Sequence, residues 1–295
     1  MKPEILVDCK CRIGEAPLWH PDEHRIYWVD IPEGILHRYS PNVDVHETFR
    51  VAEAIGGFTI QEDGTLLLFM AKGAVKLWKN GAICGTVILE IQRELDSRFN
   101  DVIADPEGRV FCGTLSSKSH SGCLYRLDID GSVQVVLEDI GMSNGLGFTP
   151  ALDKLYYTDT LKRTIYLLDY DRASGHINDK RVFVRVPDKE GKPDGLTVDQ
   201  EGCVWSAQWD GACVVRYSPQ GKEIERISFP ANKISSVTFG GINYNDLYFT
   251  SAGGLDRAKE GKFAGAFFHM RTNVSGVPEF RSKIDAYKDI RKYLR

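Results

Sequence analysis

Four oxygen-bearing side chains occupy one shared position relative to strand-like segments that lie far apart in the chain. Each stands 11 or 12 residues before the aromatic residue that marks such a segment, and the four are Glu15, Asn100, Asn144 and Asp194. Carboxylate and amide oxygens are hard ligands that suit Ca²⁺, Mg²⁺ or Mn²⁺, and also the borderline ions Zn²⁺ and Fe²⁺. Brought together, these residues would form a divalent-cation site, and three protein ligands would leave coordination positions open.

A repeated unit explains how they could meet. Six strand-like segments begin alike, and they are RIYWVD, TLLLFM, RVFCGT, KLYYTD, CVWSAQ and DLYFTS. Subtraction between the markers Tyr27, Leu67, Phe111, Tyr156, Trp205 and Tyr248 gives spacings of 40, 44, 45, 49 and 43 residues. This period is typical of propeller blades, which pack around an axis because one blade cannot bury its own faces. The sequence therefore predicts an all-β, six-bladed β-propeller with four-stranded antiparallel blades, with residues 1–295 as a single domain.

Turn chemistry supports this arrangement. Five expected hairpin turns end in a glycine suited to left-handed backbone, and these are Gly64, Gly108, Gly131, Gly202 and Gly221. The last unit lacks a clear fourth strand. We expect the N-terminal segment, residues 4–8, to supply that strand and close the ring, because a closed ring leaves few exposed edges.

Equivalent positions in a ring lie at one height, so six residues should converge on one mouth of the axis. They are Glu15, Gly56, Asn100, Asn144, Asp194 and Ser236. Two converging carboxylates repel each other, and a divalent ion is the simplest way to stabilise them. The alternative is that Asn144-Gly145 and Asp194-Gly195 are only turn dipeptides. Against it, the hairpin turns are assigned elsewhere, and Glu15 and Asn100 share the register without a following glycine.

The amino-acid composition limits the classes of binding partner that we expect. The 295 residues include 37 basic and 41 acidic side chains, a net charge of -4, and 42% of the residues are hydrophobic. Such a balance favours a folded core and a small, neutral or weakly charged partner, with no nucleic acid and no membrane. We expect no leader peptide, and the sequence has no apolar run long enough to span a bilayer.

Cysteine usage indicates the compartment. Seven cysteines without a CxxC pair favour reduced thiols and a cytoplasmic protein. Cys9-x-Cys11 could hold a soft metal, but buried small apolar side chains are the simpler interpretation. Gly141-Met-Ser-Asn-Gly145 matches a nucleophile elbow, yet a strand rather than a helix is expected to follow, so we treat the match as accidental.

Several stretches together resemble one family. They are Gly14-Glu-Ala-Pro-Leu-Trp19, Arg98-Phe-Asn-Asp101 with Asp105-Pro-Glu-Gly108 and Gly113-Thr114, Ser143-Asn-Gly-Leu146, Tyr156-Tyr-Thr-Asp159, Pro193-Asp-Gly195 and Ser236-Val-Thr-Phe-Gly-Gly241. The sequence is similar, over nearly its whole length, to the regucalcin (senescence marker protein), gluconolactonase and luciferin-regenerating enzyme family. That resemblance implies a six-bladed propeller in which Glu15, Asn144 and Asp194 hold the metal, while Arg98 and Asn100 contact the substrate.

One region departs from the family pattern. After Gly113-Thr114, relatives can place an acidic residue near the substrate, whereas Ser116, Ser117 and Lys118 stand here. Lys118 either favours a more acidic substrate or is a solvated loop residue.

The combined expectation is metal-dependent hydrolysis of a sugar (aldono-) lactone to the sugar acid. One divalent ion (Ca, Zn, Mn, Mg or Fe) would polarise the carbonyl and lower the pKa of a bound water. Asp194 would orient or deprotonate that water, and Arg98 would fix the sugar and stabilise the oxyanion. The alternatives are a non-catalytic calcium-binding scaffold and a promiscuous phosphotriesterase. We expect a monomer or a weak homo-oligomer.

Overall fold

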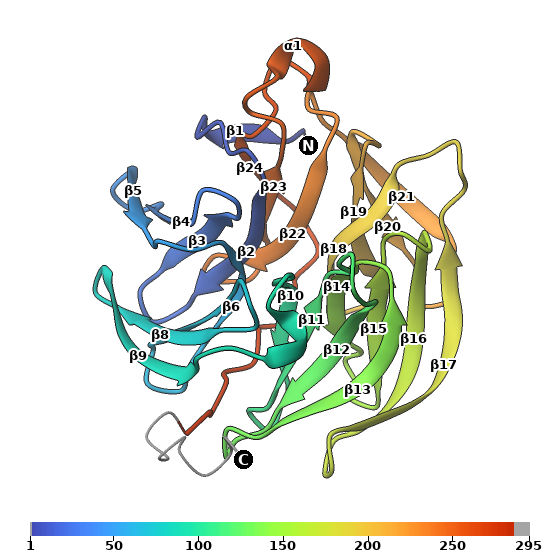
Figure 1. Ribbon diagram of the computed structural model, residues 1–295. Helices are drawn as coiled ribbons and strands as arrows, with labels where there is room; N and C mark the ends of the chain where they lie inside the picture. Colours follow the sequence, from blue (N-terminus) through green and yellow to red (C-terminus); the bar gives the residue numbers. More distant parts are fainter. Residues whose placement is uncertain (1, 286–295) are drawn as a thin grey trace.

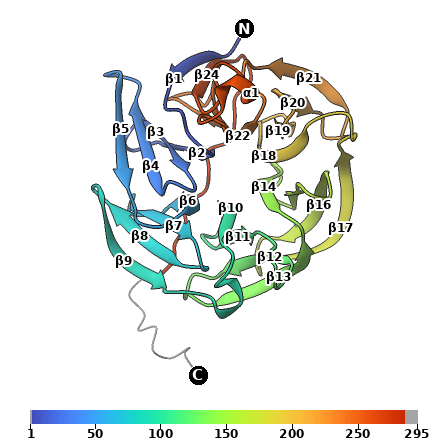
Figure 2. The ribbon, with the colours of Figure 1, turned by 45° about the horizontal axis from the view of Figure 1, so that its top comes forward.

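The computed structural model describes residues 2–285, which form six four-stranded antiparallel sheets around a common axis (Figures 1 and 2). From the axis outward, the first three blades are β2 (Gly14–His20), β3 (Arg25–Asp30), β4 (Ile35–Ser40) and β5 (Val45–Arg50); β6 (Ile55–Ile60), β7 (Leu66–Met70), β8 (Val75–Lys79) and β9 (Ala82–Ile88); β10 (Phe99–Ala104), β11 (Val110–Thr114), β12 (Gly122–Leu127) and β13 (Val133–Ile140). The last three are β14 (Ser143–Phe148), β15 (Lys154–Asp159), β16 (Thr164–Asp171) and β17 (His176–Arg185); β18 (Lys192–Val198), β19 (Val204–Trp209), β20 (Cys213–Tyr217) and β21 (Glu223–Ser228); β22 (Ile234–Gly240), β23 (Asp246–Ser251), β24 (Phe267–Arg271) and β1 (Glu4–Val7). The predicted six-bladed propeller is confirmed, and every marker residue lies in the second strand of its blade.

The N-terminal strand closes the ring. β1 pairs antiparallel with β24, and Glu4 lies opposite His269 in that register. The first and last segments therefore share blade 6, as expected from the missing fourth strand. The five turn glycines also have the positive φ values that hairpin turns require, from 77° at Gly221 to 98° at Gly108.

Every inner strand contains a β-bulge near its start. The register shifts fall between Glu15 and Leu18, Ile55 and Gly57, Phe99 and Val102, Asn144 and Leu146, Pro193 and Leu196, and Ile234 and Ser236. A bulge re-aims a side chain and ends regular pairing. The six residues that the repeat aligned thus share a local backbone irregularity as well as a position.

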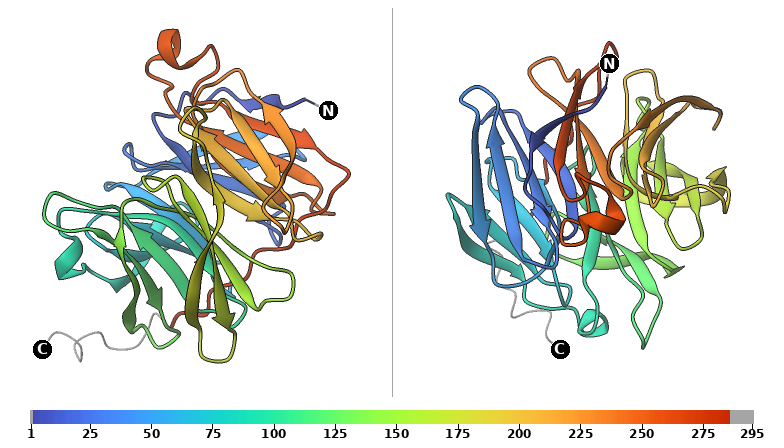
Figure 3. Two further views of the ribbon diagram at one scale, coloured as in Figure 1. Left: turned by 90° about the vertical axis from the view of Figure 1, so that its right-hand side faces the viewer. Right: turned by 90° about the horizontal axis from the view of Figure 1, so that it is seen from above.

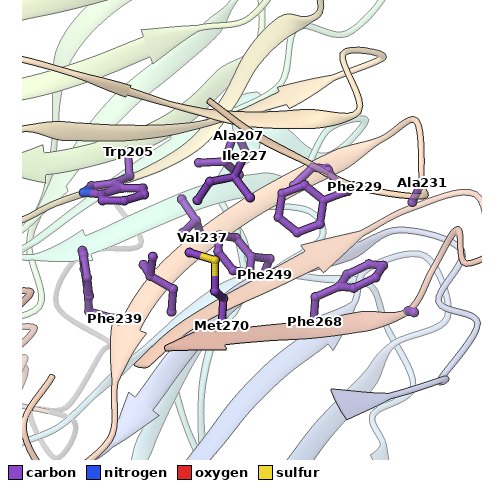
Figure 4. Packing of buried hydrophobic residues seen from close by; sticks show 14 of the residues in the cluster. Trp205, Ala207, Ile227, Phe229, Ala231, Val237, Phe239, Phe249, Phe268 and Met270 are labelled. Atoms are coloured by element: carbon purple, nitrogen blue, oxygen red, sulfur yellow. The ribbon is translucent and has the colours of Figure 1, made fainter. Parts of the chain in front are cut away.

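The core lies between neighbouring blades. In the contact between blades 5 and 6, Trp205 packs edge-to-face on Phe239, and Phe229 packs on both Phe249 and Phe268 (Figure 4). Truncating one such buried aromatic to alanine costs about 3–5 kcal/mol of the free energy of unfolding. The facing sides of adjacent blades therefore pack together and fix the inner strands in position.

The segment after β24 runs across one face of the ring (Figure 3). It hydrogen-bonds blade 6 through Gly276 N to Tyr244 O (2.7 Å), blade 2 through Ser282 N to Ile60 O (2.9 Å), and blade 3 through Lys283 N to Gly108 O (2.8 Å). We call residues 272–285 the C-terminal strap. Within the described part of the chain, no helix is long and apolar enough to cross a membrane.

Candidate metal and substrate site

A cavity of about 200 Å³ opens at the mouth of the axis, at the starts of the inner strands. Its polar lining includes five of the six site residues predicted from the sequence, namely Glu15, Arg98, Asn100, Asn144 and Asp194. They come from blades 1, 3, 4 and 5, so only the closed ring brings them together.

Two buried carboxyl groups face this cavity. Glu15 on β2 and Asp194 on β18 are 7% and 3% exposed. Burial raises the pKa of Glu15 to about 8, with a further contribution from the charge of Asp101. Burial also raises the pKa of Asp194 well above its usual range, and the charge of Glu15 adds to this. Both effects disfavour the ionised pair unless a positive charge lies beside it.

Arg98 supplies part of that positive charge. Burial lowers the pKa of its guanidinium to about 10, and the carboxylates of Glu15 and Asp194 oppose this shift. The guanidinium also donates from Nη1 to Oδ1 of Asn100 (2.6 Å). Arg98 therefore lies beside both carboxyl groups and also anchors the first of the amides.

The amides form a directed chain of hydrogen bonds. Asn100 donates from Nδ2 to Oδ1 of Asn144 (2.8 Å), and Asn144 donates from Nδ2 to Oγ1 of Thr160 (2.9 Å). Thr160 in turn donates to the carbonyl oxygen of Pro193 (2.7 Å). Because the Arg98 guanidinium can only donate, Oδ1 of Asn100 accepts and its Nδ2 donates, and this order fixes which end of the Asn144 amide is oxygen.

The residues fit a divalent cation. Oδ1 of Asp194 is buried and has no hydrogen-bond partner among the described residues, so one carboxylate oxygen is available as a ligand. Glu15 supplies the second carboxylate, and Oδ1 of Asn144 keeps a lone pair beyond the bond from Asn100. Two anionic oxygens and one neutral oxygen are the donor set expected for a hard cation.

A second group of possible ligands is already neutralised. Ligand atoms of Asp199, Glu201 and Cys203 lie within 4.8 Å of one another. However, Arg216 donates to Asp199 (2.7 Å) and to Glu201 (2.7 Å), and Trp205 donates to Asp199 (2.9 Å). The guanidinium provides the compensating charge, so we do not assign a metal to this group.

The remaining aligned positions have other roles. Gly56 allows close approach of blade 3, because a Cβ there would lie 2.0 Å from the carbonyl oxygen of Phe99. Ser236 lines a separate, deeper cavity. Lys118 is exposed and is not among the residues that line the mouth. Ser143 is fully buried in β14, which continues as a strand rather than turning into a helix.

Sequence reasoning missed two residues at the mouth. Lys192 and Trp209 line the cavity and lie opposite each other in the pairing of β18 with β19. Lys192 precedes Asp194 by two residues, and Trp209 ends the marker strand of the same blade. The repeat carries no signal for Trp209, because the last residues of the other marker strands do not line this cavity.

It also missed two carboxyl groups deeper in the channel. Asp101 and Glu279 line the deeper cavity, and Glu279 belongs to the C-terminal strap. Burial raises the pKa of Asp101 to about 6 and that of Glu279 to about 7, with the charge of Asp101 adding to the second shift. Carboxyl groups are thus present at both levels of the axis.

Fold and site together define a six-bladed propeller with an oxygen-lined axial pocket. The chain belongs to the SMP-30/Gluconolactonase/LRE-like family, whose model matches residues 13–253. It is 46% identical over 288 residues to pentonolactonase XacC of Haloferax volcanii, covering 95% of this chain and 97% of that protein. It is 35% identical to 6-deoxy-6-sulfogluconolactonase of Pseudomonas putida, covering 90% of this chain and 94% of that protein. A calcium-binding regucalcin structure from Agrobacterium tumefaciens has the same fold, with a TM-score of 0.87 at 23% identity over 95% of this chain and 97% of that one. The family predicted from the sequence motifs is confirmed.

Proposed function

We propose that this protein hydrolyses a sugar lactone to the sugar acid, in the cavity at the mouth of the axis and with one divalent cation. The observation that carries the proposal is Oδ1 of buried Asp194, which has no hydrogen-bond partner within residues 2–285 and shares a cavity with Glu15 and the oriented amide oxygen of Asn144. The names of the pentonolactonase and the sulfogluconolactonase support this substrate class.

The residues that line the cavity would have separate roles in cation binding and in orienting water. Glu15, Asn144 and Asp194 would hold the cation, which when bound polarises the lactone carbonyl and lowers the pKa of water. Asp194 would also accept a hydrogen bond from the attacking water and so orient it toward the ring carbonyl. A carboxylate that holds a cation is a weakened base, so its orienting role would exceed its basicity.

Arg98 would act on the substrate side. Its guanidinium would donate to the ring oxygen or to hydroxyls of the sugar and stabilise the negative charge that develops on the carbonyl oxygen. Asn100 lies between Arg98 and Asn144 in the hydrogen-bond chain, so it would hold the substrate-binding residue and the cation ligand in one geometry. Trp209 and Leu161 give the cavity apolar walls that limit access of bulk water.

Within this class we propose a five-carbon aldonolactone, because the relative with 46% identity is named a pentonolactonase. The cation would be one of Ca²⁺, Mn²⁺, Mg²⁺, Zn²⁺ or Fe²⁺, since the donors are oxygens. We place the activity in the cytoplasm on the basis of the cysteine usage, and we expect a monomer or a weak homo-oligomer.

A panel of lactones tests the proposal. Acid release from five- and six-carbon aldonolactones is followed by pH-stat, with the spontaneous rate subtracted and with an aryl phosphotriester as a further substrate. We expect the highest kcat/KM on a five-carbon lactone and little turnover of the phosphotriester. If calorimetry shows that the cation binds but every lactone is hydrolysed only at its spontaneous rate, the protein is instead a non-catalytic scaffold.

A further inference from the structure

Two cysteines lie where the propeller ring closes. Cys9 and Cys11 are in the connection between β1, the closing strand, and β2, which carries Glu15 (Figure 1). The thiol of Cys11 donates a hydrogen bond to Sγ of Cys9, and the two sulfurs are 3.4 Å apart. The residue between them, Lys10, has a φ of 55°, so the backbone departs from the extended form that would separate alternate residues by about 6.6 Å.

The two thiols differ in access and in acidity. Cys11 is 1% exposed, whereas Cys9 is partly exposed and also donates to the carbonyl oxygen of Gly265 (3.2 Å). The hydrogen bond from Cys11 lowers the pKa of Cys9, and the same bond together with burial raises the pKa of Cys11. Because thiolates are the reactive form, Cys9 is the nucleophile of the pair and Cys11 is the thiol held beside it.

A pair of histidines lies behind Cys11. Nε2 of His37 is 3.6 Å from Sγ of Cys11, and Nδ1 of His37 is 3.0 Å from Nε2 of the exposed His46. Both rings stack on Trp28, with ring centroids 4.9 and 5.3 Å away. Burial, with the charge of His46, lowers the pKa of His37 to about 3, so its imidazole is neutral and a weak base, suited to passing a proton on to His46 rather than keeping it. The histidines thus form a path from the buried thiol to solvent.

The same atoms do not form a metal cage. The ligand atoms of Cys9, Cys11 and His37 are not among the groups that lie within 4.8 Å of one another in the described chain. Nε2 of His37 faces the sulfur of Cys11, the thiol that must lose its proton, while its Nδ1 faces His46. The arrangement favours thiol chemistry over metal binding.

We propose that Cys9 and Cys11 are an oxidative modification site that forms a reversible disulfide on reaction with a hydroperoxide. The sulfur of Cys9 attacks the peroxide, an S–O bond forms as the O–O bond breaks, and water or an alcohol leaves. The sulfur of Cys9 is oxidised by two electrons and the peroxide is reduced. The sulfur of Cys11 then attacks the Cys9 sulfenic acid, so that an S–S bond forms and the S–O bond breaks. The departing hydroxide takes the Cys11 proton, directly or through His37, and leaves as water.

The geometry makes the disulfide accessible and easy to reduce. The sulfurs must approach by about 1.3 Å to reach a disulfide bond length of about 2.05 Å. A bridge that closes so short a loop is strained, and strained or exposed disulfides are the labile ones. A thiol reductant should therefore reverse the modification.

The test is peroxide treatment of the full chain in a Cys84→Ser background, since Cys84 is the exposed cysteine of the described set. We expect the intact mass to fall by two hydrogen atoms, two fewer thiols to react with a colorimetric reagent, and dithiothreitol to restore both values. Partial digestion that cuts after Lys10 should leave residues on its two sides linked until reduction. An unchanged mass, a bridge elsewhere, or direct over-oxidation of Cys9 in the wild-type pair would overturn the proposal.

Three variants assign the roles. Cys11→Ser should stop at a Cys9 sulfenic acid that a cyclic 1,3-diketone traps, whereas Cys9→Ser should give no adduct at this site. His37→Phe keeps a ring stacked on Trp28 but removes the proton acceptor, and should slow disulfide formation by about a hundredfold. A trapped adduct on Cys11 rather than Cys9 would contradict the assignment.

Discussion

Nδ2 of Asn100 lies 2.8 Å from Oδ1 of Asn144, so the residue proposed to contact substrate holds the amide of a residue proposed to bind the cation. Asn100 and Asn144 are 44 positions apart in the chain and occupy equivalent places in adjacent blades. The repeat thus builds both the site and the contacts that orient it.

This contact predicts the effect of removing the donor. Asn100→Asp keeps an acceptor for Arg98 but loses the hydrogen bond to Asn144 and a second one to the carbonyl oxygen of Ser143 (2.7 Å). Loss of such an orienting partner costs about 10- to 100-fold in cation affinity, which isothermal titration calorimetry measures. On the other side of the Asn144 amide, Thr160→Val should also weaken binding, while Thr160→Ser, which keeps the hydroxyl, should not. Equal affinities in all four proteins would show that the hydrogen-bond chain does not orient the ligand.

Cation binding should stabilise the fold. A ligand at a hundredfold excess over its Kd contributes about 2.7 kcal/mol to the free energy of unfolding. Chelated protein should therefore unfold at a lower temperature, and addition of the divalent ion should raise its Tm by several degrees. Glu15→Gln should lose this response, because one anionic ligand is gone. A full-size rise in Tm in Glu15→Gln would mean that the cation binds elsewhere. Asp199→Asn, which removes a carboxylate outside this cavity, is the matched control and should keep the full rise in Tm.

Substitution of Lys192 and of Lys118 should affect kcat/KM differently. Lys192 lines the cavity, whereas Lys118 is exposed and outside its lining. On a lactone that carries a sulfonate or carboxylate, Lys192→Ala should lower kcat/KM about tenfold, which corresponds to the loss of one charge-assisted hydrogen bond. The loss should be smaller on a neutral lactone, and Lys118→Ala should change neither rate. The opposite ranking would restore Lys118 as the substrate contact.

Glu279 gives the protein a distinct pH dependence. Burial raises its pKa in the folded protein to about 7, above the unfolded value of about 4.3. The folded state therefore binds the proton more tightly, and this contribution to stability is lost as pH rises from about 4.5 to about 7. Allowing for the partial exposure of the side chain, Glu279→Gln should add about 1–2 kcal/mol at pH 8 and little at pH 5. Urea unfolding at the two pH values measures this.

The exposed Glu90 provides the control for that measurement. Glu90→Gln should leave stability unchanged at both pH values. If Glu279→Gln destabilises the protein at pH 8, the carboxylate of Glu279 is compensated by a positive charge rather than buried at a cost.

The sequence was sufficient for the architecture because each blade repeats the same strands and turn glycines. Equivalence in a ring follows from the period, and it correctly predicted four of the six aligned residues at the mouth. The prediction was wrong for Gly56 and Ser236, which are not among the residues that line this cavity. The sequence did not predict the bulges, which depend on backbone register, nor the C-terminal strap, whose residues 272–285 belong to no repeat. Glu279 was missed for that reason, and Lys192 was missed because lysine is usually solvated and its spacing carries no signal.

We propose that Asp194 is needed for turnover as well as for holding the cation. The decisive measurement is the rate of acid release from a five-carbon aldonolactone by wild-type protein and by Asp194→Asn, each stripped with a chelator and then supplied with a divalent ion. The account predicts that the wild-type rate falls to the spontaneous value on stripping and returns with the ion, while the variant stays at the spontaneous value throughout. A wild-type rate in Asp194→Asn, or in stripped protein without the ion, would contradict it.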